Sequence, residues 1–263
     1  MERNILIEIA GGVGTVKLNR ADRHNAFDAA TIAELTAAFT AFADDPAVRV
    51  VVLASTGKSF CAGADLNWMK AAAAQGYDDN LADARNLAGM LHRLAALPKP
   101  TVARVQGPAY GGGVGLVAAC DIAIACADAR FALSEVRLGL IPSTIGPHVV
   151  AAIGARHAKR YMLSAESFGA ADAQAMGLIH EVVADVVALD AAVTRTVAAL
   201  LQNGPAALAA CKQLVADIAG QPLSPELIED TARRIATTRA GAEAREGIAA
   251  FLERRKPGWI EGS

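Results

Sequence analysis

The chain has 263 residues with 53% hydrophobic and 20% charged side chains, and Lys+Arg 25 nearly balance Asp+Glu 27. This composition excludes a disordered or low-complexity protein, because such chains contain too few apolar residues to form a core. The formal charge of −2 and the absence of a long basic run argue against nucleic-acid binding. We therefore expect a folded protein whose partners are small molecules or copies of itself.

The cysteines and the N-terminus favour a reducing compartment. The chain has four cysteines, Cys61, Cys120, Cys126 and Cys211. They form no C-x-x-C pair and no Cys/His spacing typical of a metal site, so we predict reduced structural thiols and no metal. Glu2 and Glu8 stand where a secretory signal would be basic and then apolar, which favours the cytoplasm. The uncharged stretches 107–120 and 138–155 contain glycine and proline and fit buried packing better than a membrane span.

The first half of the chain alternates predicted strands and helices. Runs of β-branched or alternating apolar residues predict strands at residues 5–9, 13–18, 48–53, 101–105, 121–125 and 130–133. Gly11-Gly12 predicts a hairpin between the first two strands. Apolar residues at helical spacing predict helices at 28–44 and 78–97, the first capped by Asp28. The repeated order of strand, small-residue corner and helix indicates a layered α/β coil.

Beyond Pro147 the strand signal nearly disappears and alanine-rich helical segments follow. These are residues 149–163, 169–176, 188–202, 205–218, 225–237 and 242–255. Pro205 and Pro225 fit first-turn positions of two of these helices. The last third is therefore predicted to be a helical appendage. Because its helices are rich in Ala, Val and Leu, they need a surface to pack on, and we expect self-association.

Two corners made of small residues each follow a predicted strand, and the second is rich in glycine. The first is Ser59-Phe-Cys-Ala-Gly-Ala-Asp65 and the second is Gly107-Pro-Ala-Tyr-Gly-Gly-Gly-Val-Gly115. A helix that starts near Gly112 has unpaired first-turn N–H groups and a positive dipole end, which both favour a negative oxygen. With a second N–H from Ala64, the two donors would form an oxyanion hole. Glu135 lies between apolar segments and is the natural proton-transfer group beside it.

The strings FCAGADL, GPAYGGGVGL and ALSEVRLGLIP, in that order, resemble the crotonase family, also called the enoyl-CoA hydratase/isomerase superfamily. The resemblance extends to NRADRHNAFD, AADAQAMGLIHEVV and EGIAAFLERRKPGW, and so covers nearly the whole chain. It implies an α/β fold, a ββα superhelix core at 1–195 followed by a helical trimerisation region at 196–263. It also implies a homotrimer or a dimer of trimers.

The resemblance implies roles for individual residues as well. The N–H groups of Ala64 and Gly112 would hold the thioester oxygen, and Glu135 would transfer the proton. The residues implied in coenzyme A binding are Ala26, Ala62, Asp65, Leu66, Phe251 and Lys256. No permanently bound cofactor is expected, because coenzyme A enters as part of the acyl-CoA substrate.

One position departs from the family pattern. The best-known hydratases carry a second glutamate where this chain has Gly115. Hydration of a conjugated enoyl-CoA is the main prediction, and isomerisation of a double bond by Glu135 alone is the alternative. The strings GGGVGLVAACDIAIA and SEVRLGLIPSTI look closest to the branch that hydrates methylglutaconyl-CoA and carboxygeranoyl-type CoA esters. The hypothesis that follows is that the space at Gly115 admits a branched substrate whose distal carboxylate pairs with Arg137 or His148.

Other interpretations of the same residues remain open. Residues 113–118 match the dinucleotide pattern G-x-G-x-x-A, but Pro108, Ala109 and Tyr110 separate them from the preceding strand, which argues against an NAD-linked oxidoreductase. Cys61 has no His placed by sequence to activate it and is interpreted as a packed residue. Glu135 as a merely structural group, and the whole chain as a non-catalytic acyl-CoA binding protein, are the less specific alternatives.

Overall fold

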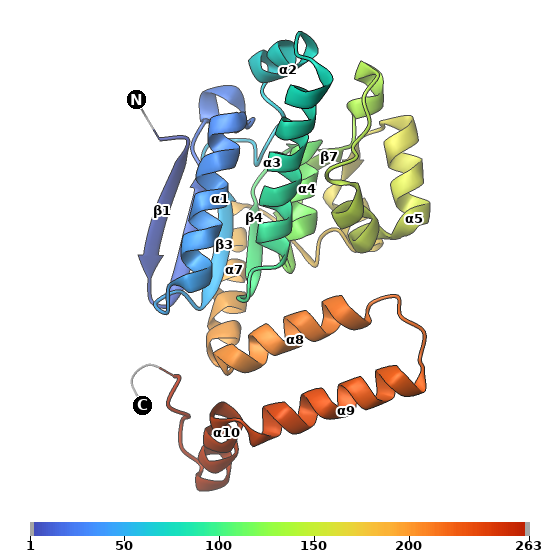
Figure 1. The fold of residues 1–263 in the computed structure, drawn as a ribbon. Coiled ribbons are helices and arrows are strands. Elements are labelled where there is room, and N and C mark those ends of the chain that lie inside the picture. The colour runs from blue at the N-terminus through green and yellow to red at the C-terminus, as the bar shows by residue number, and fades with distance from the viewer. Residues whose placement is uncertain (1–2, 261–263) are drawn as a thin grey trace.

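Two β-sheets form the centre of the computed structural model, which describes residues 3–260 (Figure 1). The larger sheet has six strands in the order β1-β2-β3-β4-β6-β9, and the smaller has three in the order β5-β7-β8. The strands are β1 Ile5–Ala10, β2 Val13–Leu18, β3 Val50–Ser55, β4 Thr101–Val105, β5 Ala109–Tyr110, β6 Ile122–Cys126, β7 Arg130–Ala132, β8 Phe168–Gly169 and β9 Glu181–Val183. In the larger sheet β1 and β2 are antiparallel and the other neighbours are parallel.

Helices cover both faces of the larger sheet and continue beyond it. They are α1 Ala29–Asp44, α2 Leu66–Ala73, α3 Tyr77–Ala95, α4 Gly112–Ala119, α5 Gly146–Ser164, α6 Ala170–Met176, α7 Val186–Leu201, α8 Pro205–Ile218, α9 Pro225–Ala240 and α10 Ala242–Glu253, with short 3-10 turns η1 Ala21–Arg23 and η2 Glu135–Leu138. The predicted α/β fold class is confirmed.

The strand β3 shows why a near-continuous β-branched run predicts a buried strand. All of its residues are buried, because α1 and α3 pack on one face of the sheet and α7 packs on the other (Figure 1). Leu53 belongs to the core under α1 and α3, whereas Val52 packs toward Leu189 and Val193 of α7. Because both faces of such a strand are buried, its sequence is a continuous apolar run and does not alternate between apolar and polar residues.

Three very short strands depart from the sequence prediction. The segments β5, β8 and β9 were not predicted, and β8 and β9 lie beyond Pro147, where the strand signal is weak. The strands β5 and β8 have two residues each, too few for an alternating pattern, and β9 offers only two valines after Glu181. The parallel pairing of β9 with β6 completes the larger sheet. Tertiary pairing rather than local sequence therefore defines these strands.

The last three helices lie outside the layered body (Figure 1). Helices α8 and α9, which the structure describes in full, contain no buried residue, and α10 buries only Ala250. Polar links join this region to the body: the Lys212 ammonium donates to Asp121 at 2.7 Å, and the Arg49 guanidinium donates to the Asn203 carbonyl at 2.7 Å. Helix α7 packs on the sheet and runs on past residue 195 to Leu201. Within residues 3–260, no helix has the length and apolarity needed to cross a bilayer.

Candidate active site

The first corner, residues 59–65, is fixed by a bridge to the segment before α1. The Phe27 N–H donates to the Gly63 carbonyl at 2.9 Å, and the Asp65 N–H donates to the Phe27 carbonyl at 2.9 Å. These bonds define a parallel bridge between Phe27 and Ala64. In such a bridge the N–H of the middle residue points away from its partner strand. No backbone hydrogen bond within residues 3–260 uses the Ala64 N–H, so it is free to bind a ligand.

The second corner turns the chain from β5 into α4. Gly111 adopts a φ of 49°, which favours glycine, and its N–H donates to the Ala132 carbonyl at 2.9 Å. Helix α4 begins at Gly112, whose N–H is in the first turn and has no partner inside the helix. A Cβ at Gly112 would lie 2.3 Å from the Phe27 ring. The close approach to Phe27 therefore requires glycine and holds this amide beside the first corner.

The two corners meet at Gly63. A Cβ placed on Gly63 would lie 2.8 Å from the Tyr110 carbonyl oxygen and 3.4 Å from the Gly112 nitrogen. The Tyr110 N–H also donates to the Cys61 carbonyl at 2.9 Å. Ala64 follows Gly63 directly, so its amide and that of Gly112 come from two adjoining segments. The structure brings together the two predicted N–H donors.

Glu135 completes this cluster. It is the first residue of η2, and a Cβ on Gly111 would lie 3.0 Å from its Oε1 atom. Its other oxygen, Oε2, is buried and has no hydrogen-bond partner within residues 3–260. Burial raises the pKa of this carboxyl above its ordinary value, against a smaller lowering by a backbone hydrogen bond. An unpaired buried carboxylate is costly for stability and typical of proton-transfer sites.

The side chain of Asp65 has a structural role in the first corner. Its Oδ1 accepts from the Asn67 N–H at 2.9 Å and so caps α2. Its Oδ2 pairs with the guanidinium groups of Arg20 and Arg23, each at 3.0 Å. Burial acts to raise the Asp65 pKa, but the hydrogen bonds and Arg20 outweigh it and the pKa is lowered. This ionised side chain ties η1 to the start of α2.

The residues implied in coenzyme A binding separate into two groups. Ala26, Ala62, Asp65 and Leu66 line the first corner, where the Ala62 N–H donates to the His24 carbonyl at 3.0 Å and Leu66 is 81% exposed. Phe251 and Lys256 are exposed on α10 and just after it, at the opposite end of the chain's fold from α2 (Figure 1). One copy of the chain does not bring these two residues to the corner.

The space beside Gly115 is filled by protein. A Cβ at Gly115 would lie 2.3 Å from Cγ2 and 2.8 Å from Cβ of Ile145, which is 2% exposed. The hypothesis that this position leaves room for a substrate branch is therefore wrong. No sequence pattern signalled this contact, because Ile145 lies 30 residues further along the chain.

The two residues suggested for a distal carboxylate have other surroundings. The Arg137 guanidinium donates to the Ala165 carbonyl at 2.7 Å and so binds the end of α5. This contact gives Arg137 a structural role in the chain. His148 is half-buried in α5, and burial followed by the nearby charge of His92 lowers its pKa.

Three other kinds of site considered from the sequence can be compared with the structure. Cys61 is fully buried, and burial raises the pKa of its thiol to about 12, which disfavours the nucleophilic thiolate. Within residues 3–260, no three His, Cys, Asp or Glu side chains gather as a metal site would require. Residues 113–118 lie wholly within helix α4, so they do not form the turn from strand to helix that a dinucleotide loop provides.

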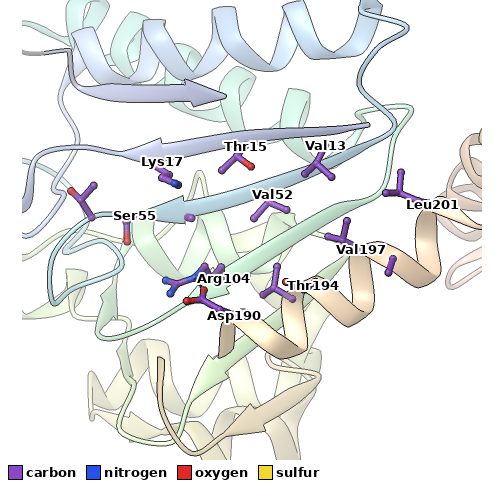
Figure 2. A pocket seen from close by; sticks show the side chains of 14 residues that line it. Val13, Thr15, Lys17, Val52, Ser55, Arg104, Asp190, Thr194, Val197 and Leu201 are labelled. Atoms are coloured by element: carbon purple, nitrogen blue, oxygen red, sulfur yellow. Dashed lines mark hydrogen bonds and ion pairs between the residues drawn. The ribbon is translucent and has the colours of Figure 1, made fainter. Parts of the chain in front are cut away.

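A groove of about 700 Å³ lies on another part of the molecule. Figure 2 shows it between the outer face of β2 and β3 and the helix α7, with Val52 and Val197 on its walls. Arg104 and Asp190 form an ion pair of 2.6 Å at its edge. None of the residues Ala64, Gly112 and Glu135 lines this groove, so it is separate from the candidate active site.

Comparison with known proteins identifies the family. Residues 8–262 match the family described as enoyl-CoA hydratase/isomerase. The chain belongs to this family, and it is an enzyme of the crotonase superfamily. A crystal structure of an enoyl-CoA hydratase from Shewanella pealeana superposes with a TM-score of 0.95 at 42% identity, covering 98% of this chain and 96% of that one.

Curated relatives agree with this assignment. The putative enoyl-CoA hydratase of Thermus thermophilus is 34% identical over 247 residues, 94% of this chain and 97% of the relative. The 2,3-dehydroadipyl-CoA hydratase of Escherichia coli is 34% identical over 242 residues, 91% of this chain and 92% of the relative. Enoyl-CoA hydratases are thus the relatives that this chain resembles along nearly its whole length.

Proposed function

We propose that this chain is an enoyl-CoA hydratase that adds water across the conjugated double bond of an acyl-CoA thioester. The amides of Ala64 and Gly112 bind the thioester oxygen, and Glu135 moves the proton. The observation that carries the proposal has two parts, both among the described residues: the two adjoining corners each offer an N–H without a backbone partner, and Glu135, whose Oε2 is buried and unpaired, lies against the second corner at Gly111. The names of the relatives support hydration as the reaction.

The chemistry follows from this arrangement. Hydrogen bonds to the thioester oxygen draw electrons from the double bond and make the β-carbon electrophilic. Ionised Glu135 accepts a proton from water as the water oxygen bonds to the β-carbon, and the thioester becomes an enolate. Glu135 then returns the proton to the α-carbon, which restores the thioester carbonyl. Removal of one such hydrogen-bond donor typically raises the barrier by about 2.7–4 kcal/mol.

The variant Glu135→Gln tests this proposal. It keeps the shape of the side chain but removes its proton-accepting oxygen, so turnover should fall by about 10²–10⁴-fold while acyl-CoA binding persists. Glu166→Gln is the matched control, because that carboxylate lies at the surface and pairs with Arg160. Hydration is followed by loss of the enoyl-thioester absorbance, and binding by calorimetry. Full turnover by Glu135→Gln would refute the assignment of the proton-transfer group.

Isomerisation is the second candidate, because Glu135 has no second glutamate at position 115 to share the two proton transfers. One carboxylate is sufficient to move a proton from one substrate carbon to another. A β,γ-unsaturated acyl-CoA and its conjugated isomer should therefore be assayed side by side. Conversion of the first without water addition to the second would make isomerase the correct function.

The acyl group is a separate proposal. Sequence resemblance supports a glutaconyl-type substrate, and the relative named 2,3-dehydroadipyl-CoA hydratase supports a carboxylated acyl chain. The filled space at Gly115 and the Ala165 contact of Arg137 give this substrate no support. Steady-state hydration of 3-methylglutaconyl-CoA and crotonyl-CoA decides the point, since equal or better use of crotonyl-CoA rejects the branched substrate.

Self-association is proposed from the helical appendage. The side chains of Ile228, Ile235, Ile248 and Phe251 are exposed on α9 and α10, and apolar surface of this kind favours contact with another copy. Contact of Phe251 or Lys256 with coenzyme A at the Ala64 corner requires such a copy. We propose a homotrimer or a dimer of trimers, in which residues 1–195 form the core and residues 196–263 form the associating region. We also propose that the protein is located in the cytoplasm. Sedimentation of Phe251→Glu against the unmodified chain tests the assembly.

A further inference from the structure

The contact between Gly115 and Ile145 lies one helical turn below the Glu135 carboxylate. The Gly115 N–H donates to the Gly111 carbonyl at 3.2 Å, which places these glycines on consecutive turns at the start of α4. A Cβ added to Gly111 would point at Glu135 Oε1, and a Cβ added to Gly115 would point at Ile145 Cγ2. Glu135 and Ile145 therefore pack against consecutive turns of the same helix start.

Ile145 is held firmly in this place. It is 2% exposed, and its carbonyl accepts from the Val149 N–H at 3.0 Å in the first turn of α5. Glu135 is held in the same loop, where its carbonyl accepts from the Leu140 N–H at 3.1 Å. A single loop thus supplies both the carboxylate and the apolar side chain at the next helical turn.

We propose that Ile145 is a positioning residue for Glu135: its side chain fills the space beside Gly115 and so keeps water and other polar groups out from beneath the carboxylate. The inference rests on the proposed function, in which Glu135 transfers the proton. Position 115 has no carboxylate, and the apolar side chain of Ile145 fills the space there. Ile145 thereby keeps the surroundings of the Glu135 carboxylate dry.

The groups around Glu135 support an apolar rather than a charged environment. The titratable residues nearest in the chain to Gly111, Glu135 and Ile145 are Tyr110, Arg137 and His148. None of them has a hydrogen bond to Glu135 Oε2, and Arg137 donates to the Ala165 carbonyl instead. Among the residues that the structure describes, none donates a hydrogen bond to Glu135 Oε2, and burial raises the Glu135 pKa. Exclusion of water is therefore the physical cause through which Ile145 acts.

The pair Ile145→Thr and Ile145→Val provides the first test. Threonine and valine have nearly the same volume, but threonine introduces a hydroxyl that stabilises the charged carboxylate. The acid limb of the pH profile of kcat/KM should move to lower pH by roughly one unit in Ile145→Thr, a part of the shift that burial can produce. It should stay in place in Ile145→Val. If the acid limb of kcat/KM lay at the same pH in Ile145→Thr and Ile145→Val, the inference would be overturned.

A stability cycle tests the contact itself. Gly115→Ala should lower the midpoint of thermal unfolding strongly, because its Cβ meets Ile145 Cγ2. In the Ile145→Ala background the same change should cost clearly less, although Cβ of residue 145 stays close. Strictly additive effects would mean that the two residues do not compete for one space.

The outcome of Glu135→Gln separates this inference from the proposed function. Retained turnover in Glu135→Gln would refute the proton-transfer role and the proposed function with it. Lost turnover together with identical pH profiles in Ile145→Thr and Ile145→Val would refute only the role of Ile145.

Discussion

The two corners around Glu135 and the helices α8–α10 are held in opposite ways. The corners are fixed by backbone hydrogen bonds and by contacts that leave no space for a Cβ at Gly112 or Gly113. The appendage is joined to the body through polar side chains such as Lys212 and Arg49, and most of its apolar side chains are exposed. Oxyanion-hole geometry needs rigid donors, whereas a surface that meets another copy must remain uncovered in the single chain.

The largest expected effect is from Gly113→Ala in the second corner. The new Cβ would lie 2.3 Å from the Cys61 carbonyl oxygen, which also accepts from the Tyr110 N–H. Backbone must shift to relieve this contact, so the free energy of unfolding should fall by about 3 kcal/mol, the upper part of the range for overpacking. Denaturant unfolding measures this loss, and hydration should fall with it because both donors are displaced. An unchanged midpoint would show that the backbone at Cys61 yields to the new Cβ without loss of stability.

The second prediction concerns the ion pairs that hold the first corner. Asp65→Asn preserves the α2 cap but removes the charge that pairs with Arg20 and Arg23. Arg20 retains Asp28 as a partner at 3.0 Å, so a loss of about 2 kcal/mol is expected near neutral pH. The effect should be seen in denaturant unfolding.

The stability difference between the unmodified protein and the Asp65→Asn variant should depend on pH in a defined way. The folded-state pKa of Asp65 is lowered, so its stabilisation is complete above its ordinary value of 3.8 and is lost as the pH falls through the lower folded value. The difference in stability between the unmodified protein and the Asp65→Asn variant should therefore narrow only below that ordinary value. A difference that narrows already near neutral pH would contradict the assignment.

A smaller effect is expected at the link to α8. Lys212→Met removes the ion pair with Asp121, which still accepts from the Thr101 N–H at 2.8 Å. The global free energy of unfolding should fall by about 1 kcal/mol or less. Hydrogen exchange should accelerate in α8 and remain unchanged in β4. Arg233→Ala is the control, because its pair with Glu229 is exposed within α9 and should not affect either region.

The smallest effect has the opposite sign. Gly89→Ala lies within α3, where a Cβ meets no described atom within 4 Å. Alanine is the better helix former, so unfolding should require up to about 1 kcal/mol more. Gly113→Ala and Gly89→Ala are the same chemical change in two helices, so comparing them separates the destabilising effect of close packing from the stabilising effect of helix propensity. A destabilised Gly89→Ala protein would indicate a contact on that face of α3 that the single chain does not show.

Local patterns in the sequence determined the long elements and the chemical types at the site. The run of Val and Leu before the first corner, the Asp28 cap and the glycines around Gly112 each have a local physical reason, and the structure confirms the elements that they predicted. Only the tertiary structure decided which segments meet. Phe27 against Gly112, Ile145 against Gly115 and Arg137 on Ala165 join residues distant in the chain, and no local pattern encodes such contacts. For the same reason the two-residue strands and the filled space at Gly115 were beyond sequence prediction, because packing between elements alone creates them.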